Sequence, residues 1–303
     1  MSRIHEALKK AAQERSARLS TGTSAEFVDV ATDVSRTVVP AEDRAAPARV
    51  DLPPKRDSSF LSFDELVQKC ARPQWQPDPR IDLFHGVNSN PTGAESFRTL
   101  RSRLFQIAGT RQLKRVLVTS SIPAEGKTFV AANLAQSIAR QDHRRVLLVD
   151  ADLRLSRMHQ VLGAPSTPGL TDYLRSEMDE SAVIQRGPEG NLCFLPGGSP
   201  VSNPSELLLG ARIKHLLERV TPVFDWLIVD SPPTLPVHDA SVLADLCDGV
   251  LFVVRAGKTD FELAEKASSE FRDKNLLGVV LNCVEKNESY GGYYYSYPAT
   301  PKE

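Results

Sequence analysis

An apolar segment at residues 115–119 runs into the loop 121–128, Ser-Ile-Pro-Ala-Glu-Gly-Lys-Thr, and a helical pattern begins at Thr128. The end of this loop matches the phosphate-binding pattern G-x-x-x-x-G-K-[ST], although Ser121 replaces the first glycine. In such a loop, backbone N–H groups converge on phosphate oxygens, the lysine reaches the outer phosphates and the hydroxyl binds a metal ion. We therefore predict a site for a nucleoside triphosphate, ATP with Mg²⁺. The flanking strand and helix argue against a chance match in a surface turn.

Short apolar runs alternate with helical patterns from about residue 91 onward. We expect strands at 115–119, 145–149, 192–195, 226–229, 250–254 and 279–281. We expect helices at 94–108, 128–140, 204–220, 239–246 and 259–273. Continuously apolar strands that alternate with helices indicate a mostly parallel sheet with helices on both faces. Together with the loop, this predicts an α/β fold of the P-loop NTPase class.

The two ends of the chain differ from this central part. Residues 1–18 suit a short basic helix, whereas 19–60 have no periodicity and are rich in Ser, Thr, Ala, Asp and Pro, which predicts a disordered linker. Ser62 and Glu65 have capping-box spacing, so a short helix should begin there. Five of the six tyrosines lie at 290–297, among glycines that argue against a packed element. We divide the chain into an N-terminal region at 1–90, a nucleotide-binding domain at 91–286 and a flexible tail at 287–303.

Composition narrows the class of partner. The chain has 303 residues with 37 Lys and Arg against 38 Asp and Glu, and a net charge of −1 gives no reason to expect a nucleic acid. No apolar run approaches the ~18–20 residues of a membrane span, and the N-terminus lacks the apolar core of a signal peptide, so we expect a cytoplasmic protein. The cysteines form no CxxC pair, which indicates reduced, mostly buried thiols at Cys70, Cys193, Cys247 and Cys283.

Two of the expected strands end in aspartate. The strand at 145–149 is followed by Asp150 and Asp152, and the strand at 226–229 is followed by Asp230. Because parallel strands place their carboxyl ends at one edge of the sheet, these side chains should converge beside the phosphate loop. They would hold Mg²⁺, and the additional carboxylate suggests a base that accepts a proton from an incoming hydroxyl. The alternative is that they only cap the following helices.

These motifs, in this order, resemble those of the bacterial tyrosine kinases of capsule and exopolysaccharide export. The resemblance covers roughly residues 90–297. It rests on the P-x-E-G-K-T loop, on 146–154, which is similar to the family's second Walker motif, and on 227–233, which is similar to its Walker B. It also rests on the E-x-x-R-x-x-R form of 95–101 and on the tyrosine cluster. Ser121 and Ala124 stand where many relatives carry glycine, so we expect a tighter loop.

The resemblance implies ATP-dependent phosphorylation of protein tyrosines. Lys127 and Thr128 would hold the phosphates and the metal ion, and Asp150 and Asp230 would organise Mg²⁺ and its water shell. Asp152, together with Asp150, would accept the tyrosine proton. The implied nucleotide-binding residues are Pro123, Ala124, Glu125, Gly126, Lys127, Thr128, Phe129 and, as a contact to the base, Asn282.

The resemblance also implies a ring of subunits in which the tail of one subunit enters the neighbouring site. The acceptors would be Tyr290, Tyr293, Tyr294, Tyr295 and Tyr297. A phosphate adds roughly −1.5 to −2 charges, so modified tails would repel an acidic site and loosen the ring. The ring contact would come from Glu95, Arg98 and Arg101. From the sequence alone, an ordinary helix face with a Glu95–Arg98 pair is the favoured interpretation, and a low-complexity tail without a role is the alternative for the tyrosines.

Members of this family commonly carry, or pair with, a two-helix membrane subunit. The sequence shows no such segment, so the implied form is the stand-alone cytoplasmic one, recruited to the inner face of the membrane by a membrane-anchored activator. Its role would be to regulate exopolysaccharide or capsule synthesis. The basic helix at 1–18 is a candidate for docking on a partner or an anionic membrane surface, with a solvated terminal helix as the alternative.

Two other functions fit part of the pattern. An ATPase switch of the Min/Par type has a similar nucleotide fold, but its loop carries an extra lysine at the position of Ile122, and it gives no reason for a tyrosine tail. A non-catalytic ATP-binding scaffold of polysaccharide assembly is disfavoured because Lys127, Asp150, Asp152 and Asp230 are all present.

Overall fold

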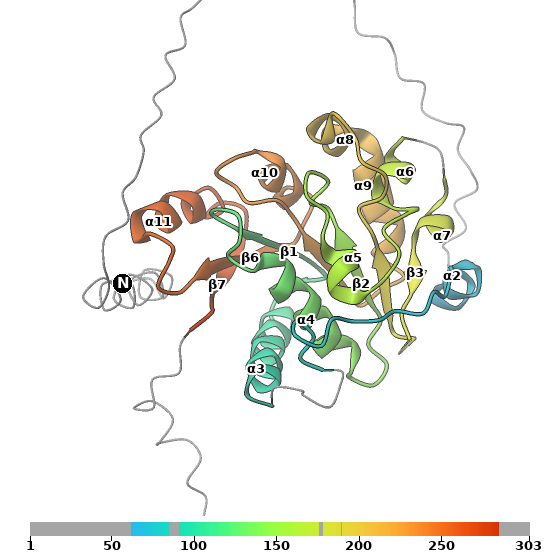
Figure 1. The fold of residues 1–303 in the computed structure, drawn as a ribbon, viewed down its shortest axis with the longest axis horizontal. Coiled ribbons are helices and arrows are strands. Elements are labelled where there is room, and N and C mark those ends of the chain that lie inside the picture. Colours follow the sequence, from blue (N-terminus) through green and yellow to red (C-terminus); the bar gives the residue numbers. More distant parts are fainter. Residues whose placement is uncertain (1–61, 85–90, 176–177, 189, 285–303) are drawn as a thin grey trace, which may run out of the picture.

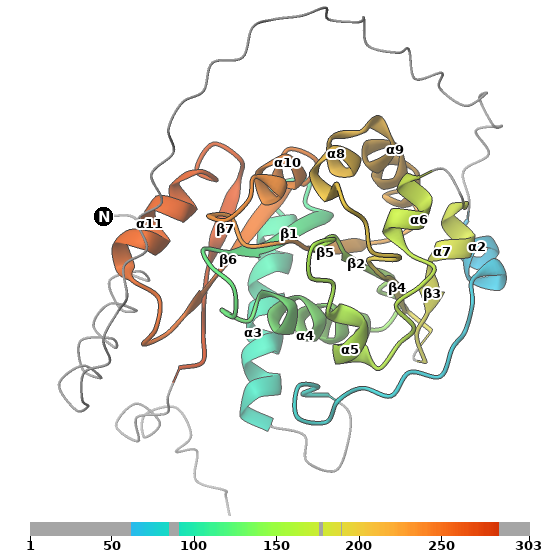
Figure 2. The ribbon, with the colours of Figure 1, turned by 45° about the horizontal axis from the view of Figure 1, so that its top comes forward.

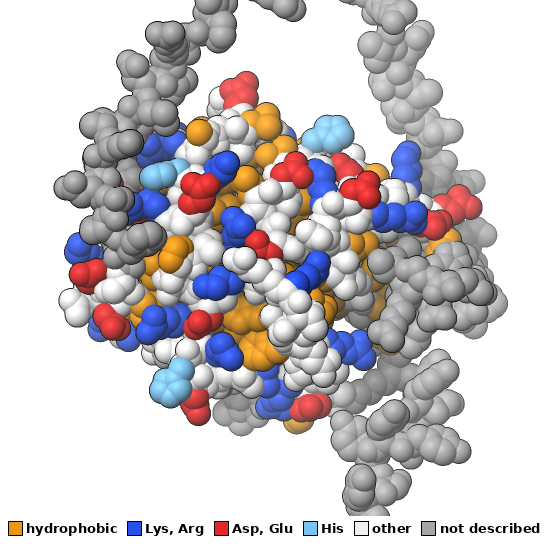
Figure 3. Space-filling view, turned by 180° about the vertical axis from the view of Figure 1, so that it is seen from behind, with side chains coloured by type: hydrophobic (Ala, Val, Ile, Leu, Met, Phe, Trp, Pro, Cys, Tyr) orange, Lys and Arg blue, Asp and Glu red, His pale blue; other side chains and the backbone are white. Residues whose placement is uncertain are grey.

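The computed structural model describes residues 62–84, 91–175, 178–188 and 190–284. The expected helix at 1–18, the linker at 19–60 and the tyrosine tail lie outside these residues. Among the described helices, none has both the length and the apolar character needed to cross a bilayer. On the face shown in Figure 3, acidic and basic side chains are interspersed.

Within the described residues, seven strands form one sheet in the order β3-β4-β2-β5-β1-β6-β7, and Figure 2 labels each of them. Neighbouring strands are parallel, except that β3 runs antiparallel to β4. The strands are β1 (Arg115–Ser120), β2 (Val146–Asp150), β3 (Gln185–Arg186), β4 (Leu192–Leu195), β5 (Trp226–Asp230), β6 (Gly249–Arg255) and β7 (Leu276–Asn282). The predicted α/β fold with a mostly parallel sheet is confirmed.

Helices cover both faces of this sheet (Figures 1 and 2). One face carries α3 (Pro91–Ala108), α4 (Lys127–Ala139) and α5 (Met158–Leu162). The other face carries α6 (Leu170–Leu174), α8 (Pro204–Leu209), α9 (Ala211–Val220), α10 (Asp239–Ala244) and α11 (Phe261–Ser269). The short helices α2 (Phe63–Lys69) and α7 (Glu180–Val183) lie near the β3 edge.

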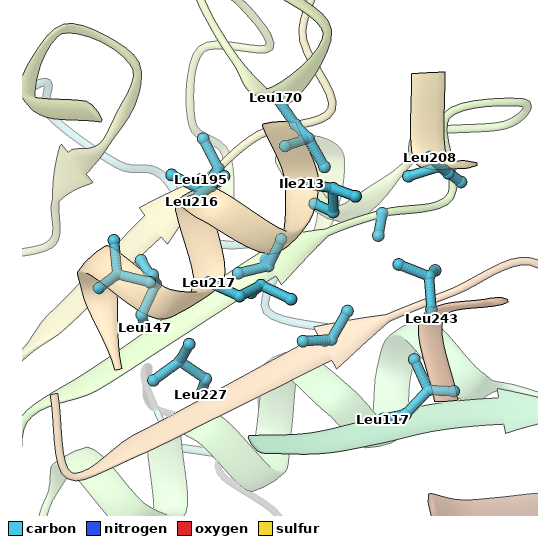
Figure 4. Packing of buried hydrophobic residues seen from close by; sticks show 14 of the residues in the cluster. Leu117, Leu147, Leu170, Leu195, Leu208, Ile213, Leu216, Leu217, Leu227 and Leu243 are labelled. Carbon is cyan, nitrogen blue, oxygen red and sulfur yellow. The ribbon is translucent and has the colours of Figure 1, made fainter. Parts of the chain in front are cut away.

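Alternate residues of the central strands face opposite sides, so the sheet separates two cores. Leu227 and Val229 of β5 belong to the core under α8, α9 and α10, where Leu216 and Leu217 of α9 pack over the sheet (Figure 4). Ile228, between them in sequence, belongs to the core under α3 and α4. Because both faces are buried, these strands are continuously apolar in sequence.

The helix predicted at Ser62 is confirmed, with a capping box at its start. Ser62 Oγ accepts the Glu65 N–H at 3.2 Å, and Glu65 Oε2 accepts the Ser62 N–H at 3.0 Å. Phe63 and Leu66 of α2 are buried in the core under α9, and the Phe63 ring meets Phe224 edge-on at 5.6 Å. This helix is therefore part of the packed domain.

After α2, an extended strap (residues 70–84) runs along the molecule to α4 (Figure 2). Trp75 packs edge-on against Phe194 of β4 at 6.0 Å. At the end of the strap, the buried side chain of Asn133 in α4 accepts the Leu83 N–H at 3.0 Å and donates to the Ile81 carbonyl at 3.1 Å. Packing thus continues N-terminal to residue 91, where we expected the domain to begin. The difference arises because these contacts join residues about 50 positions apart.

Some expected elements differ from those observed. The helix expected at 204–220 is two helices, because Gly210 between them has extended backbone angles of −66° and 154°. The elements β3, α5, α6 and α7 were not expected, since segments this short show no periodicity. The other expected strands and helices are present, with ends displaced by a few residues.

Candidate active site

The phosphate loop, residues 121–128, connects β1 to α4. Gly126 is the N-cap of α4, has φ = +92° and provides no side-chain cap. Ala124 is also left-handed, with φ = +66°, a conformation that costs an L-residue roughly 1–2 kcal/mol. The first N–H groups of α4 therefore have no capping side chain, which is the arrangement that suits a phosphate group.

Glu125 holds the loop from within, although we expected it among the nucleotide-binding residues. Its side chain is 1% exposed. Oε2 accepts the Ile122 N–H at 2.8 Å, and Oε1 accepts the Thr259 hydroxyl at 2.5 Å. Both carboxylate oxygens are thus occupied by the protein. Only the backbone of this residue remains for a nucleotide. The one sequence signal that Glu125 supports the loop was the presence of a charged residue inside the motif.

The ends of β6 and β7 support the loop from outside. Arg255 Nη1 donates to the Ala124 carbonyl at 3.2 Å, and Asn282 Nδ2 donates to the Glu125 carbonyl at 2.9 Å. A Cβ atom on Gly126 would lie 2.0 Å from Asn282 Nδ2 and the φ angle here is +92°, so any other residue would displace Asn282 and strain the backbone. Asn282 is therefore a support of the loop, and its contact to a base stays a prediction.

The structure brings the three predicted aspartates together beside Lys127. Asp150 and Asp230 are register partners at the carboxyl ends of the neighbouring strands β2 and β5. Lys127 Nζ lies 2.9 Å from Asp152 Oδ2. All three carboxylates are buried. The alternative that these aspartates only cap helices is therefore incomplete, because they form one cluster with the lysine of the loop.

The two strand-end aspartates differ in their partners. Asp150 Oδ2 accepts the Ser156 hydroxyl at 2.6 Å and the Met158 N–H at 3.2 Å, and Oδ1 accepts the Asp152 N–H at 3.2 Å. In contrast, Asp230 Oδ1 is buried and has no hydrogen-bond partner among the described residues. An unpaired buried oxygen is costly, so Asp230 is the carboxylate most in need of a ligand.

Burial dominates the electrostatics of this cluster. It raises the pKa of Asp230 above the ordinary carboxyl value, against the opposing effect of Lys127. Burial also raises the pKa of Asp150, against the hydrogen bond from Ser156. Burial alone would lower the pKa of Lys127, but Asp230 and Asp152 outweigh it and the pKa is raised. The lysine is thus a firmly charged counter-ion to a buried acidic cluster.

The residues present fit a magnesium ion that arrives with a nucleotide. Among the described residues, no group of three or more His, Cys, Asp or Glu side chains is arranged to hold a metal by itself. Mg²⁺ typically takes one or two carboxylates and completes its shell with water and substrate phosphates. The unpaired oxygen of Asp230, next to Thr128 at the start of α4, meets that requirement.

Arg154 links the second aspartate loop to two helices, a role that we did not predict. Its Nε donates to Asp239 Oδ2 at 2.8 Å, and its Nη2 donates to Ser205 Oγ at 2.6 Å. Ser205 Oγ in turn donates to Asp239 Oδ1 at 2.6 Å. The loop after β2 is thereby fixed to the first turns of α8 and α10. The only sequence signal was the position of Arg154 two residues after Asp152.

The three residues expected at a subunit contact have different environments. Arg98 and Glu95 form an exposed pair on α3 at 2.9 Å. Arg101 instead turns inward, and its Nη1 donates to the Ser137 carbonyl of α4 at 2.6 Å. Arg98 and Glu95 are therefore available to a neighbour, whereas Arg101 also ties α3 to the helix that carries the phosphate loop.

A family model described as "CobQ/CobB/MinD/ParA nucleotide binding domain" matches residues 117–294. The chain is 37% identical over 204 residues to the tyrosine-protein kinase YwqD of Bacillus subtilis, covering 66% of this chain and 86% of that protein. It is 34% identical to the tyrosine-protein kinase CpsD of Streptococcus agalactiae, covering 66% and 87%. It is 33% identical to the tyrosine-protein kinase wzc of Salmonella typhimurium but spans only 31% of that longer protein.

The fold is similar to that of a solved structure, the kinase domain of the Escherichia coli tyrosine kinase ETK. The TM-score is 0.64 with 27% identity, and the match covers 80% of this chain and all of that domain. The kinase domain of VpsO has a TM-score of 0.59 with 26% identity, and the match covers 66% of this chain and all of that one. The comparisons thus agree with the motifs on which the resemblance rests.

Proposed function

The chain belongs to the CobQ/CobB/MinD/ParA nucleotide-binding family and to the bacterial tyrosine-protein kinases, and from this premise we propose that it is an ATP-dependent tyrosine autokinase. Its acceptors are the tail tyrosines Tyr290, Tyr293, Tyr294, Tyr295 and Tyr297. The observation that carries the proposal is the cluster of Lys127 with three buried carboxylates beside a phosphate loop. A charged lysine at that place can stabilise a transferring phosphoryl group.

The nucleotide is held mainly by the backbone. The backbone N–H groups of residues 124–129, in the end of the loop and the first turn of α4, surround the phosphates of ATP, and the helix adds the positive end of its dipole. Thr128, Asp150 and Asp230 would hold Mg²⁺, which would supply positive charge to the phosphates during transfer. Glu125, Arg255 and Asn282 keep the loop in its binding shape.

Asp152 is the proposed base. Its Oδ1 accepts the Leu155 N–H at 3.0 Å, and its Oδ2 pairs with Lys127. When Lys127 turns to the phosphates, Oδ2 becomes free to accept the tyrosine proton. The tyrosine oxygen then forms a bond to the γ-phosphorus, the bond from that phosphorus to the oxygen of ADP breaks, and the proton ends on Asp152.

We propose that the reaction occurs between subunits of a ring. Glu95 and Arg98, exposed on α3, together with Arg101, contribute to the contact. By function we divide the chain into an N-terminal region at 1–90, whose helix α2 and strap pack on the kinase domain, the kinase domain itself at 91–286 and a tyrosine tail at 287–303. The proposed setting is the cytoplasm, where a membrane-anchored activator recruits the enzyme to regulate exopolysaccharide or capsule synthesis.

The main rival is a Min/Par-type ATPase switch. It is disfavoured because Ile122, not lysine, precedes the loop's main lysine by five positions. A scaffold that binds ATP without catalysis would have no need for the Lys127–Asp152 pair or for a buried, unpaired Asp230 oxygen.

The test is to incubate the purified chain with ATP and Mg²⁺, with and without the cytoplasmic segment of a membrane activator, and to detect phosphotyrosine by antibody and mass spectrometry. We expect label in the tail, and none in Lys127→Met. Lys266→Met, which changes an exposed lysine of α11, is the matched control and should keep the label. Labelling of Lys127→Met at the wild-type level would refute the assignment. A chain with all five tail tyrosines changed to Phe should still bind ATP but lose most of the label.

A further inference from the structure

A pocket of about 780 Å³ lies away from the phosphate loop, between the N-terminal half of α3, the turn after α4 and the end of the strap. Its volume is within the range of small-ligand sites. Phe84, Leu83 and Ala94 provide apolar surface, and the remaining lining is dominated by arginines. We call it the arginine pocket, after Arg98, Arg101, Arg140 and Arg144.

The arginine pocket has an excess of positive charge. Four guanidinium groups line it, whereas Asp142 is its one acidic lining residue among those described, and Glu95 pairs with Arg98 from beside it. The nearby positive charge affects Arg101. Burial and the neighbouring Arg98 lower the pKa of its guanidinium, although Glu95 acts in the opposite direction. Like charges brought together in a recess are stabilised by an anion that enters it.

The guanidinium groups are held in place by the protein. Arg101 Nη1 donates to the Ser137 carbonyl at 2.6 Å, while its Nε is buried and has no hydrogen-bond partner among the described residues. Arg140 donates to the Phe84 carbonyl at 3.1 Å, and its guanidinium lies 5.3 Å from the centre of the Phe84 ring. Arg144 lies 5.3 Å from the Phe105 ring. Because their positions are set in advance, binding an anion orders few additional side chains.

Arginine forks match the oxygens of a phosphate monoester, which can accept several hydrogen bonds at once. The apolar wall at Phe84 and Leu83 suits a ligand whose phosphate is attached to a flat, apolar group. We propose that the arginine pocket binds a phosphotyrosine of the modified C-terminal tail. This inference rests on the proposed function, because that reaction is the source of the ligand.

The position of the pocket couples phosphotyrosine binding to the contact between subunits. Arg98 and Arg101 are also the proposed contact residues of the ring, so a phosphotyrosine seated on them competes with a neighbouring subunit. Arg140 caps the C-terminal end of α4, the helix whose first residue is Lys127. The pocket thus connects the product of the reaction to the subunit contact, and it offers a physical basis for the loosening of the ring by modified tails that the family resemblance implies.

The test uses synthetic peptides of residues 288–299 with one phosphotyrosine, added to the full-length chain after phosphatase treatment and without ATP. Calorimetry should give at least tenfold tighter binding than for the unmodified peptide and for a peptide with glutamate at the same position. The double variant Arg140→Ala/Arg144→Ala should lose at least tenfold in affinity. Arg103→Ala is the matched control, since Arg103 is an exposed residue of α3 outside the pocket lining, and it should bind normally.

Three results would overturn the inference: equal binding of the glutamate peptide, equal binding of the unmodified peptide, or unchanged binding by a folded double variant. Circular dichroism and thermal melting establish that the variant is folded. Inorganic phosphate and free phosphotyrosine are added as competitors, and phosphate that competes as well as phosphotyrosine would show that the apolar wall plays no part. Because the peptide is synthetic, this experiment fails or succeeds independently of whether the chain phosphorylates itself.

Discussion

The ammonium group of Lys127 lies 2.9 Å from Oδ2 of Asp152, and the two side chains are 14% and 4% exposed. This buried pair joins the phosphate loop to the loop that follows β2. A triphosphate in the site offers the lysine new oxygens. Binding of the nucleotide and release of Asp152 are therefore linked in the mechanism that we propose.

The proposed role of Asp152 predicts a separation of binding from catalysis. In Asp152→Asn, Lys127 remains free to meet the phosphates, so the affinity for ATP should stay within a few-fold of the wild type. Autophosphorylation should fall by about 100-fold or more, the usual contribution of a general base. Fluorescent-nucleotide titration and a phosphotyrosine time course measure the two quantities. A variant that loses both equally would mean that Asp152 serves binding and not proton transfer.

The buried carboxylate of Asp230, whose Oδ1 has no hydrogen-bond partner among the described residues, predicts a trade-off between stability and activity. Because burial raises its pKa in the folded state, ionising Asp230 costs the folded protein free energy once the pH exceeds the ordinary carboxyl pKa near 4. The cost grows as the pH rises toward the raised value. Asp230→Asn removes it, so at pH 8 the variant without nucleotide should have a free energy of unfolding roughly 1–3 kcal/mol above the wild type.

At pH 4.5, where Asp230 is largely protonated, this difference should be much smaller. Urea unfolding at the two pH values gives the difference in the free energy of unfolding between variant and wild type at each pH. The same variant should lose autophosphorylation. A difference that is independent of pH would indicate that the stabilisation does not come from the buried charge.

The hydrogen bonds of Glu125 predict an effect on nucleotide binding without contact to the nucleotide. Glu125→Ala leaves the Ile122 N–H and the Thr259 hydroxyl without their buried acceptor, so the free energy of unfolding should fall by roughly 2–3 kcal/mol. The loop also loses its internal brace, and the affinity for ATP should fall at least tenfold. Glu262→Ala, an exposed glutamate of α11, should change neither quantity in the same urea and nucleotide titrations.

The left-handed Ala124 predicts that the loop is strained. Ala124→Gly should raise the free energy of unfolding by about 1 kcal/mol, because glycine adopts φ = +66° without the steric cost. The larger freedom of glycine in the unfolded chain reduces the gain. Ala124→Val, with a β-branched side chain at the same backbone angles, should lower the free energy of unfolding. Thermal melts of the two variants should therefore shift in opposite directions, and a shared direction would mean that contacts of the side chain outweigh backbone strain.

Three features can be predicted from the amino-acid sequence alone: the phosphate loop between a strand and a helix, the parallel sheet, and the meeting of Asp150 and Asp230 at one edge. These features follow from local periodicity and from the geometry of parallel strands, whose carboxyl ends always lie together. The capping box at Ser62 is equally local, because its two partners are three residues apart.

The residues that hold these parts in place could be identified only from the three-dimensional fold. Glu125 meets Thr259 across 134 positions of the chain, Asn133 meets Ile81 across 52, and Arg101 meets Ser137 across 36. No local pattern encodes such partners, because a buried polar side chain is satisfied by whichever donor or acceptor the packed fold brings to it. For the same reason, the strap and the arginine pocket become visible only once distant segments have come together.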